Sequence, residues 1–256
     1  MNTKHHVRAK IEAHTHDHGI HTMSLHAPAL ANAAKPGQFV MVYLNKSEHL
    51  LPRPISLYDV DKAKGTITLV YIVAGAGTKI MSQWHTGHTL QVLGPLGNGF
   101  DLENCKPGER VALVGGGIGA APLYLLAKEL KRIGASMDIY LGFRQNTPPL
   151  IQCFETLADN LFVATEDGSG QYNKGYATDF LTPTHTTIFS CGPLPMLKVL
   201  ARYAYTHNIP CQVSVEERMA CGLGACKGCV VRTMVGYQLC CLNGPVFDSK
   251  EVNWDA

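Results

Sequence analysis

Four cysteines near the C-terminal end of the chain are spaced as the ligands of a metal centre would be. Cys221, Cys226 and Cys229 are separated by four and then two residues, and Cys241 follows after eleven more. This is the plant-type spacing of a [2Fe-2S] cluster, in which cysteine thiolates hold two irons. The glycines between these cysteines leave room for backbone N–H groups to reach the cluster sulfurs. The sequence therefore predicts that the four cysteines ligate a [2Fe-2S] cluster.

Two alternatives for this centre stay open. Four cysteines also satisfy tetrahedral zinc, although zinc ribbons favour two pairs with two residues between the members, and only Cys226 and Cys229 form such a pair. Cys240 adjoins Cys241 and competes with it for the fourth position; we assign Cys241. The clustering of cysteines favours metal ligation over disulfides in a reducing compartment. The solitary cysteines are expected to be small buried residues: Cys105, Cys153 and Cys211.

A glycine-rich segment lies between an expected strand and an expected helix. The apolar run 111–114 precedes it and the helical run 122–132 follows it. The segment has the form G-x-G-x-x-A, which permits a tight turn and directs the N–H groups of a helix N-terminus at a pyrophosphate. We predict that it binds a nicotinamide dinucleotide, with a simple strand-to-helix turn as the alternative. Its glycines are Gly115, Gly116, Gly117 and Gly119, followed by Ala120.

A second segment is expected to face the same crevice. Cys191, Gly192 and Pro193 end a strand and precede a helical run. Because ligands of open α/β sheets bind at the carboxyl ends of strands, Cys191 is a candidate for positioning the nicotinamide, with a buried structural cysteine as the alternative. Arg144 follows the second strand of this region, where arginine accommodates a 2′-phosphate, so the sequence leaves NAD and NADP both open.

Two polar interruptions of apolar strands in the first hundred residues are suited to phosphate. One is Arg53-Pro54-Ile55-Ser56, and the other contains Gly77 and Thr78. Arginine holds a pyrophosphate through two parallel hydrogen bonds, and a glycine followed by threonine offers backbone and hydroxyl donors with little steric obstruction. Each segment by itself is equally well explained as a turn.

The elements that must position these residues change in character along the chain. Residues 1–102 contain short β-branched runs, such as 39–44 and 67–73, separated by turn signals, which predicts a closed antiparallel barrel. From 103 to 210 strands alternate with helical runs, which predicts a parallel α/β sheet. Residues 211–256 have too few apolar residues to fold alone and would need a metal site.

Composition excludes several classes of partner. The 22 basic and 20 acidic residues form no long run, so we expect no nucleic-acid binding. We find no apolar segment long enough for a membrane span and no signal peptide, and expect a cytoplasmic protein. The alternation of His14, His16 and His18 would place three imidazoles on one face of a strand, a conceivable metal site, but we favour a solvated edge strand.

Together, and in this order, these segments resemble the ferredoxin–NADP reductase superfamily, which pairs an FAD-binding barrel with a nicotinamide-binding α/β domain. The tail from Glu217 to Cys229, with the segment from Cys241 to Phe247, is similar to the electron-transfer subunits of two-subunit dihydroorotate dehydrogenases. The resemblance covers essentially the whole chain. It implies that FAD is bound by three segments: Arg53 to Ser56, Val70-Tyr71-Ile72 and Gly77-Thr78.

The resemblance also implies a function and a partner. Electrons would pass from an FMN-containing catalytic subunit that oxidises dihydroorotate, through the cluster and FAD, to NAD in pyrimidine biosynthesis, in a heterotetramer with two copies of each subunit. A flavin is needed because nicotinamide exchanges two electrons and the cluster one. The alternatives are the small subunit of another NAD(P)H-dependent ferredoxin or sulfur reductase, a self-contained reductase, and a non-catalytic zinc-binding module.

Overall fold

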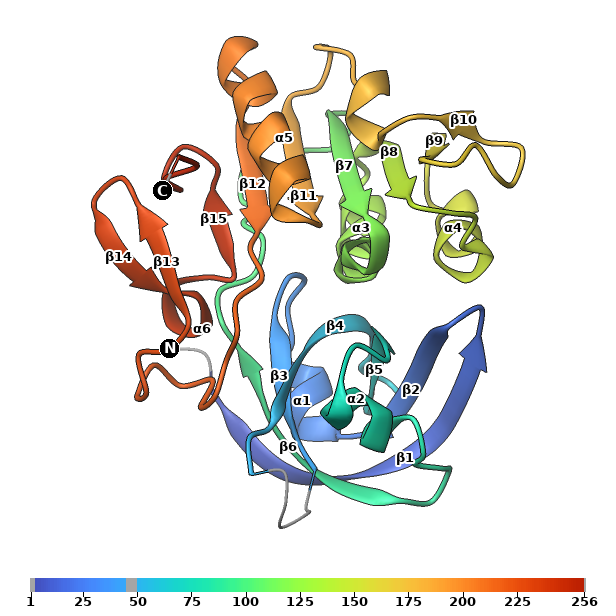
Figure 1. Ribbon diagram of the computed structural model, residues 1–256, viewed down its shortest axis with the longest axis vertical. Helices are drawn as coiled ribbons and strands as arrows, with labels where there is room; N and C mark the ends of the chain where they lie inside the picture. The colour runs from blue at the N-terminus through green and yellow to red at the C-terminus, as the bar shows by residue number, and fades with distance from the viewer. Residues whose placement is uncertain (1–2, 45–49, 256) are drawn as a thin grey trace.

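A computed structural model describes residues 3–44 and 50–255. In this structure a closed six-stranded barrel lies below a seven-stranded sheet, and a two-stranded hairpin lies beside both (Figure 1). The predicted fold class, an antiparallel barrel followed by an α/β sheet and a small C-terminal region, is confirmed. None of the helices in these ranges is long and apolar enough to cross a membrane.

The barrel is built from alternating apolar residues that face its interior. Its strands pair in the order β1-β2-β5-β4-β3-β6, and all of these pairs are antiparallel. The predicted runs 39–44 and 67–73 are strands β3 and β5. The elements are β1 (His5–Asp17), β2 (Ile20–His26), α1 (Pro28–Ala33), β3 (Phe39–Tyr43), β4 (Arg53–Asp61), β5 (Thr66–Ile72), α2 (Ala76–Met81) and β6 (Thr89–Leu96).

The upper sheet has the order β10-β9-β8-β7-β11-β12-β15, and only β15 is antiparallel to its neighbour. Its first strands are β7 (Arg110–Gly116), β8 (Ser136–Phe143), β9 (Asn160–Thr165) and β10 (Asn173–Lys174), and the others are β11 (Thr187–Cys191), β12 (Cys211–Ser214) and β15 (Val246–Asp248). The chain adds strands on one side of β7 and then, from β11 on, on the other side. The order therefore reverses between β7 and β11, where open α/β sheets bind ligands.

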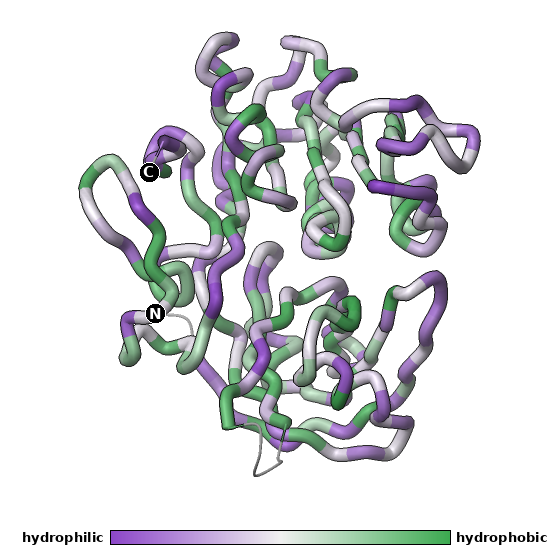
Figure 2. The backbone as a smooth tube through the Cα atoms, viewed as in Figure 1, coloured by the Kyte–Doolittle hydropathy of each residue, from purple (hydrophilic) through white to green (hydrophobic). Residues whose placement is uncertain are grey.

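Helices cover both faces of this sheet because its central strands bury apolar residues on both sides, as the mainly green and white colouring along β7 in Figure 2 illustrates. Val111 and Leu113 face α3 (Pro122–Ile133) and α4 (Pro148–Glu155). Ala112 and Val114 face α5 (Leu194–Thr206). Helix α3 also lies on the barrel, because its Leu125 belongs to the barrel core.

The C-terminal region combines its own hairpin with strands of the large sheet. The hairpin is β13 (Val230–Thr233) with β14 (Gly236–Leu239), followed by the short helix α6 (Cys240–Asn243). Strands β12 and β15, which both fall within 211–256, pair in the seven-stranded sheet. The division into domains at 1–102, 103–210 and 211–256 stays a prediction.

Candidate functional site

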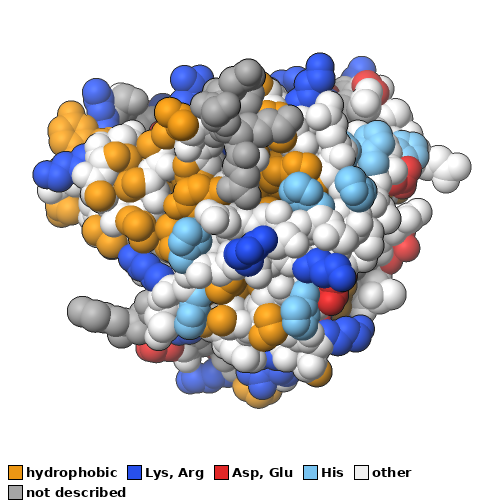
Figure 3. Space-filling model, turned by 90° about the horizontal axis from the view of Figure 1, so that it is seen from below, with side chains coloured by type: hydrophobic (Ala, Val, Ile, Leu, Met, Phe, Trp, Pro, Cys, Tyr) orange, Lys and Arg blue, Asp and Glu red, His pale blue; other side chains and the backbone are white. Residues whose placement is uncertain are grey.

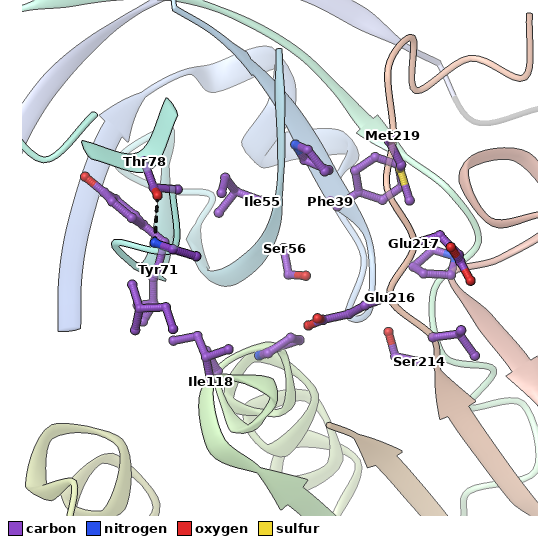
Figure 4. Close-up of a pocket in the computed structure, with 18 residues that line it drawn as sticks. Phe39, Ile55, Ser56, Tyr71, Thr78, Ile118, Ser214, Glu216, Glu217 and Met219 are labelled. Carbon is purple, nitrogen blue, oxygen red and sulfur yellow. Dashed lines mark hydrogen bonds between the residues drawn. The ribbon is translucent and has the colours of Figure 1, made fainter. Parts of the chain in front are cut away.

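A cavity lies where the barrel, the sheet and the C-terminal region meet (Figure 4). The barrel contributes β3, β4 and β5, the sheet contributes the start of α3, and the segment after β12 closes the third side. Most of the residues predicted to bind FAD line this cavity: Pro54, Ile55, Ser56, Val70, Tyr71, Ile72 and Thr78.

The two other predicted residues, Arg53 and Gly77, lie against each other beside the cavity. A Cβ atom added to Gly77 would overlap the guanidinium group of Arg53. Arg53 Nη1 donates to the Leu51 carbonyl at 2.7 Å, which fixes the side chain over the start of α2. The Thr78 hydroxyl accepts from the Ala74 N–H at 2.9 Å and donates to the Gly75 carbonyl at 3.1 Å. The arginine and the turn therefore form one preorganised unit.

Sequence reasoning missed the polar residues at the end of β12 and directly after it. Ser214, Glu216 and Glu217 all line the cavity, and the Glu216 carboxyl reaches toward Ser56 across it (Figure 4). Desolvation by the surrounding protein raises the pKa of Glu216. Only the place of β12 in the sheet could have indicated these residues. Because β12 lies beside β11, the residues after it reach the edge of the sheet where ligands bind.

The glycine loop and the Cys191 segment lie side by side, as predicted, at the carboxyl ends of β7 and β11. Cys191 is paired in register with Gly115. A Cβ atom on Gly119 would lie 2.6 Å from Gly192 Cα and 2.8 Å from the Cys191 carbonyl oxygen. The backbone of Gly119 packs directly on the backbone of Cys191 and Gly192. Only glycine permits so close an approach. Ile118, Ala121 and Pro122 then continue from the loop into the cavity wall.

The Cys191 side chain lies behind the surface that the glycine loop and the residues after β11 form. This side chain is buried, and burial, followed by the negative charge of Glu216, raises the pKa of the thiol to about 12. The thiol is therefore neutral at physiological pH. Its proposed contact with nicotinamide stays a prediction.

Arg144 lies at the carboxyl end of β8 beside two carboxylates on the end of β9. The Glu166 N–H donates to the Phe143 carbonyl at 3.0 Å, and the Asp167 N–H to the Arg144 carbonyl at 3.4 Å. Hydrogen bonds from Ser169 lower the pKa of Asp167. Arg144, Glu166 and Asp167 are all exposed, and Lys174, paired with Thr165 at the end of β9, adds a second positive charge, so the charges at this edge balance.

The four predicted cluster cysteines lie in two pairs on the loop 221–229 and on α6. Cys221 lies beside Cys226, and Cys229 beside Cys241. Backbone N–H groups point at the sulfurs: Gly224 donates to Cys241 Sγ at 3.2 Å, and Cys226 to Cys221 Sγ at 3.4 Å. Burial raises the pKa of Cys221, but the N–H groups of Cys226 and Leu223 outweigh it and lower that pKa to about 6.

Cys240 points away from these four sulfurs. It is fully buried, and its thiol donates to the Val215 carbonyl at 3.2 Å. Burial and the neighbouring Cys229 raise its pKa above the usual range. Cys240 is thus held as a neutral thiol facing β12.

On the β1–β2 hairpin, His14 and His16 both pack against His21, with ring centroids 5.4 and 4.3 Å apart. Beyond Lys10, β1 pairs with β2 alone, and His16 and His18 are exposed. His14 is also hydrogen-bonded to the Trp84 carbonyl at 2.7 Å and to the Tyr71 hydroxyl at 3.1 Å. Histidines are scattered over the barrel face seen from below (Figure 3). Across 3–44 and 50–255, no three His, Cys, Asp or Glu side chains surround a single metal position.

Comparison with known families identifies two parts of the chain. Residues 7–100 match the oxidoreductase FAD-binding domain, and residues 216–253 match the iron–sulfur cluster binding domain of dihydroorotate dehydrogenase B. The first range is the barrel with the beginning of the linker, and the second contains all four predicted cluster cysteines.

Among solved structures, the chain is similar to the NADH-dependent reduced ferredoxin-NADP oxidoreductase, with a TM-score of 0.85 and 31% identity over 96% of this chain and 90% of the other. A ferredoxin NADP+ reductase from Neisseria gonorrhoeae has a TM-score of 0.62 at 17% identity, covering 79% of this chain and 91% of that one, which shows the fold alone.

Two proteins named dihydroorotate dehydrogenase B (NAD(+)), electron transfer subunit, are similar over nearly their whole length. The one from Shouchella clausii is 42% identical over 89% of this chain and 90% of its own length. The one from Desulforamulus reducens is 38% identical over 91% and 92%. The chain therefore belongs to the family of dihydroorotate dehydrogenase B electron transfer subunits.

Proposed function

We propose that this chain carries electrons from an FMN-containing, dihydroorotate-oxidising subunit through a [2Fe-2S] cluster and FAD to NAD+ in pyrimidine biosynthesis. The observation that carries this proposal is the single cavity bordered by all three parts of the molecule. The barrel strands with Ser56, the loop with Ile118 and the segment from Glu216 to Met219 that leads to Cys221 all meet there. A flavin bound in this cavity would contact the loop proposed to bind the nicotinamide and the segment that leads to the proposed cluster.

The residues around the cavity fit FAD. Its lining is mainly apolar, with Phe39, Ile55 and Val70 as flat or branched walls for a ring system. Arg53, held over Gly77 at the start of α2, supplies a charged fork for the pyrophosphate. When bound, FAD supplies the exchange between a two-electron hydride and single electrons.

The four cysteines fit a binuclear cluster better than one zinc ion. The Cys226 N–H donates to Cys221 Sγ and the Cys241 N–H to Cys229 Sγ, both at 3.4 Å, and two such pairs suit two irons, whereas zinc ribbons favour pairs with two residues between the members. The N–H groups of Gly224 and Cys226 would stabilise negatively charged thiolates. The buried, neutral Cys240, whose thiol donates to the Val215 carbonyl, supports Cys241 as the fourth ligand.

We propose NAD as the nicotinamide dinucleotide of this chain. The switch between β7 and β11 places the glycine loop where a pyrophosphate would lie. At the far end of that crevice, Glu166 and Asp167 lie near both Arg144 and Lys174, so the local charges balance and do not by themselves select for or against a 2′-phosphate. The names of the relatives, which specify NAD(+), agree with this choice.

The proposal includes an obligate partner. Relatives are named as one subunit of dihydroorotate dehydrogenase B, and we propose a heterotetramer with two copies of each subunit. Co-expression with the candidate catalytic subunit tests this. We expect the two chains to purify together and to reduce NAD+ with dihydroorotate. A complex that reduces no NAD+ under these conditions would contradict the assignment.

The likeness to the ferredoxin-NADP oxidoreductase supports a second candidate, a small subunit serving another NADH-dependent oxidoreductase. Identity is lower there, at 31% against 42% for the Shouchella clausii relative. A complex that turns over with reduced ferredoxin but not with dihydroorotate would select this alternative.

Glu216 gives a prediction for the pH dependence of the nicotinamide step. The Glu216 carboxyl lies in the cavity with a raised pKa and could supply the proton that would neutralise a flavin after it accepts a hydride. The protonated form is present below that pKa, so the rate should fall as the pH rises through it. In Glu216→Gln we expect this decrease of the rate with pH to disappear. The rate of flavin reduction by NADH should also fall about tenfold or more. An unchanged pH profile in stopped-flow measurements would exclude the role.

A further inference from the structure

Helix α3 and strand β4 are joined by a compact set of contacts next to the cavity. Helix α3 lies directly above β4 (Figure 1). The rings of Tyr58 on β4 and Tyr124 on α3 are stacked, with centroids 4.5 Å apart and planes 8° from parallel. One turn further along, Lys128 Nζ donates to Asp59 Oδ1 at 2.5 Å. These four residues join the barrel to the upper sheet.

The same contacts reinforce one another. Lys128 Nζ lies 5.8 Å from the centre of the Tyr124 ring, so it is held by the ring face as well as by the carboxylate. Tyr124 in turn packs edge-on against Phe154 of α4, with ring centroids 5.9 Å apart. The side chains of Asp59 and Lys128 are only 26% and 39% exposed, so water screens their attraction incompletely.

The position of these residues connects both halves of the proposed reaction. Ser56 lines the cavity, and Tyr58, two residues later on the same face of β4, contacts α3. On the other side, Ala121 and Pro122 line the cavity, and Tyr124 lies half a turn beyond them. Strand β4 on the proposed flavin side and helix α3 on the proposed nicotinamide side are therefore connected within a few residues of the cavity.

We propose that Tyr58, Asp59, Tyr124 and Lys128 form an interdomain latch that sets the distance between the nicotinamide and the flavin. This inference rests on the proposed function. The four are positioning residues, because none of them lines the cavity. Hydride transfer requires near-contact of the reacting atoms. A displacement of these atoms by about 1 Å can lower the rate about 100-fold. A latch on the shared helix suppresses such displacements.

The test is the limiting rate of flavin reduction by NADH, measured by stopped flow on the intact complex. Tyr124→Ala removes the stack and the ring below Lys128, and we expect a decrease of about 10- to 100-fold. Tyr124→Phe keeps the stacked ring and should restore the rate to within about twofold of wild type. Lys128→Met keeps the length of the side chain without its charge and should give an intermediate decrease of about three- to tenfold.

A matched control is available on the same helix. Arg132→Met removes an ion pair with Glu129 that lies wholly within α3, with Nη2 2.6 Å from Oε1, and should leave the rate unchanged. Because the glycine loop is intact, the apparent Kd for NADH should change little in the latch variants while the limiting rate falls. A lower melting temperature with an unchanged limiting rate would show that the contacts are only structural and would overturn the proposal.

The outcomes also separate the latch from the proposed function. If NADH fails to reduce the flavin of the wild-type complex, the proposed function is wrong and the latch with it. If wild type is reduced and Tyr124→Ala and Lys128→Met match it, only the latch is wrong. Non-additive losses in Asp59→Asn combined with Lys128→Met would show that the two charges act as one unit.

Discussion

Cys241→Ser is expected to abolish the iron–sulfur centre while leaving the flavin half of the molecule intact. Serine replaces a thiolate that we assign to one iron, and it cannot reproduce the thiolate contact with the Gly224 N–H. Electron delivery between the two subunits should fall about 100-fold or more, because this route has no substitute. Reduction of the bound flavin by NADH should persist, since the cavity and the glycine loop do not include Cys241.

Cys240→Ala is the matched control for this prediction. Cys240 is the adjacent residue and equally buried, but its thiol faces the Val215 carbonyl. Its loss should leave the iron content unchanged and cost about 1 kcal/mol of stability for the unsatisfied carbonyl. Measured iron per subunit and visible spectra of the two variants decide the assignment. Loss of iron in Cys240→Ala with retention in Cys241→Ser would reverse it.

Gly119→Ala is expected to disable the nicotinamide side alone. The new Cβ would lie 2.6 Å from Gly192 Cα and 2.8 Å from the Cys191 carbonyl oxygen, and both are backbone atoms that cannot rotate away. The two loops at the carboxyl ends of β7 and β11 must separate, which displaces the predicted pyrophosphate site. We expect the rate of flavin reduction by NADH to fall about 100-fold, because positioning of this order controls hydride transfer.

Chemical reduction separates a local defect from general damage in this variant. Dithionite should still reduce flavin and cluster in Gly119→Ala, and FAD content should equal that of wild type. Gly108→Ala is a control for general destabilisation, because a φ of +80° strains an alanine there but its Cβ meets no neighbouring atom, so stability should fall while NADH kinetics stay unchanged. Normal NADH kinetics in Gly119→Ala would show that the loop contact is not needed.

Local patterns in the sequence predicted most of the elements, and the assignment of the cluster ligands from their spacing stays a prediction. The β-branched runs became β3 and β5, and the helical run 122–132 became α3 (Pro122–Ile133). Such elements depend on residues close in the chain, as does the spacing of Cys221, Cys226 and Cys229. For the same reason the glycine loop was recognisable, since its strand, turn and helix are consecutive.

Contacts between distant segments were not predictable in the same way. Glu216 reaches the cavity only because β12 pairs beside β11, which no local pattern of the sequence specifies. The choice between Cys240 and Cys241 depends on how α6 packs against Val215. The stack of Tyr58 on Tyr124 joins residues 66 positions apart, and two isolated tyrosines carry no motif. Pairing of this kind follows from tertiary packing.

The charge balance near Arg144 shows the same limit. From the sequence, an arginine after the second strand left NADP open. The parallel pairing of β8 with β9 and of β9 with β10 sets Glu166, Asp167 and Lys174 near it, so its charge does not act alone. These electrostatic surroundings are a property of the fold.

The central claim is that the four cysteines hold two irons and two sulfides beside a flavin-containing cavity. The most direct measurement is the iron, acid-labile sulfide, zinc and FAD content of the anaerobically purified protein. We predict about two irons, two sulfides and one FAD per chain. Stoichiometric zinc with neither iron nor sulfide would contradict the account.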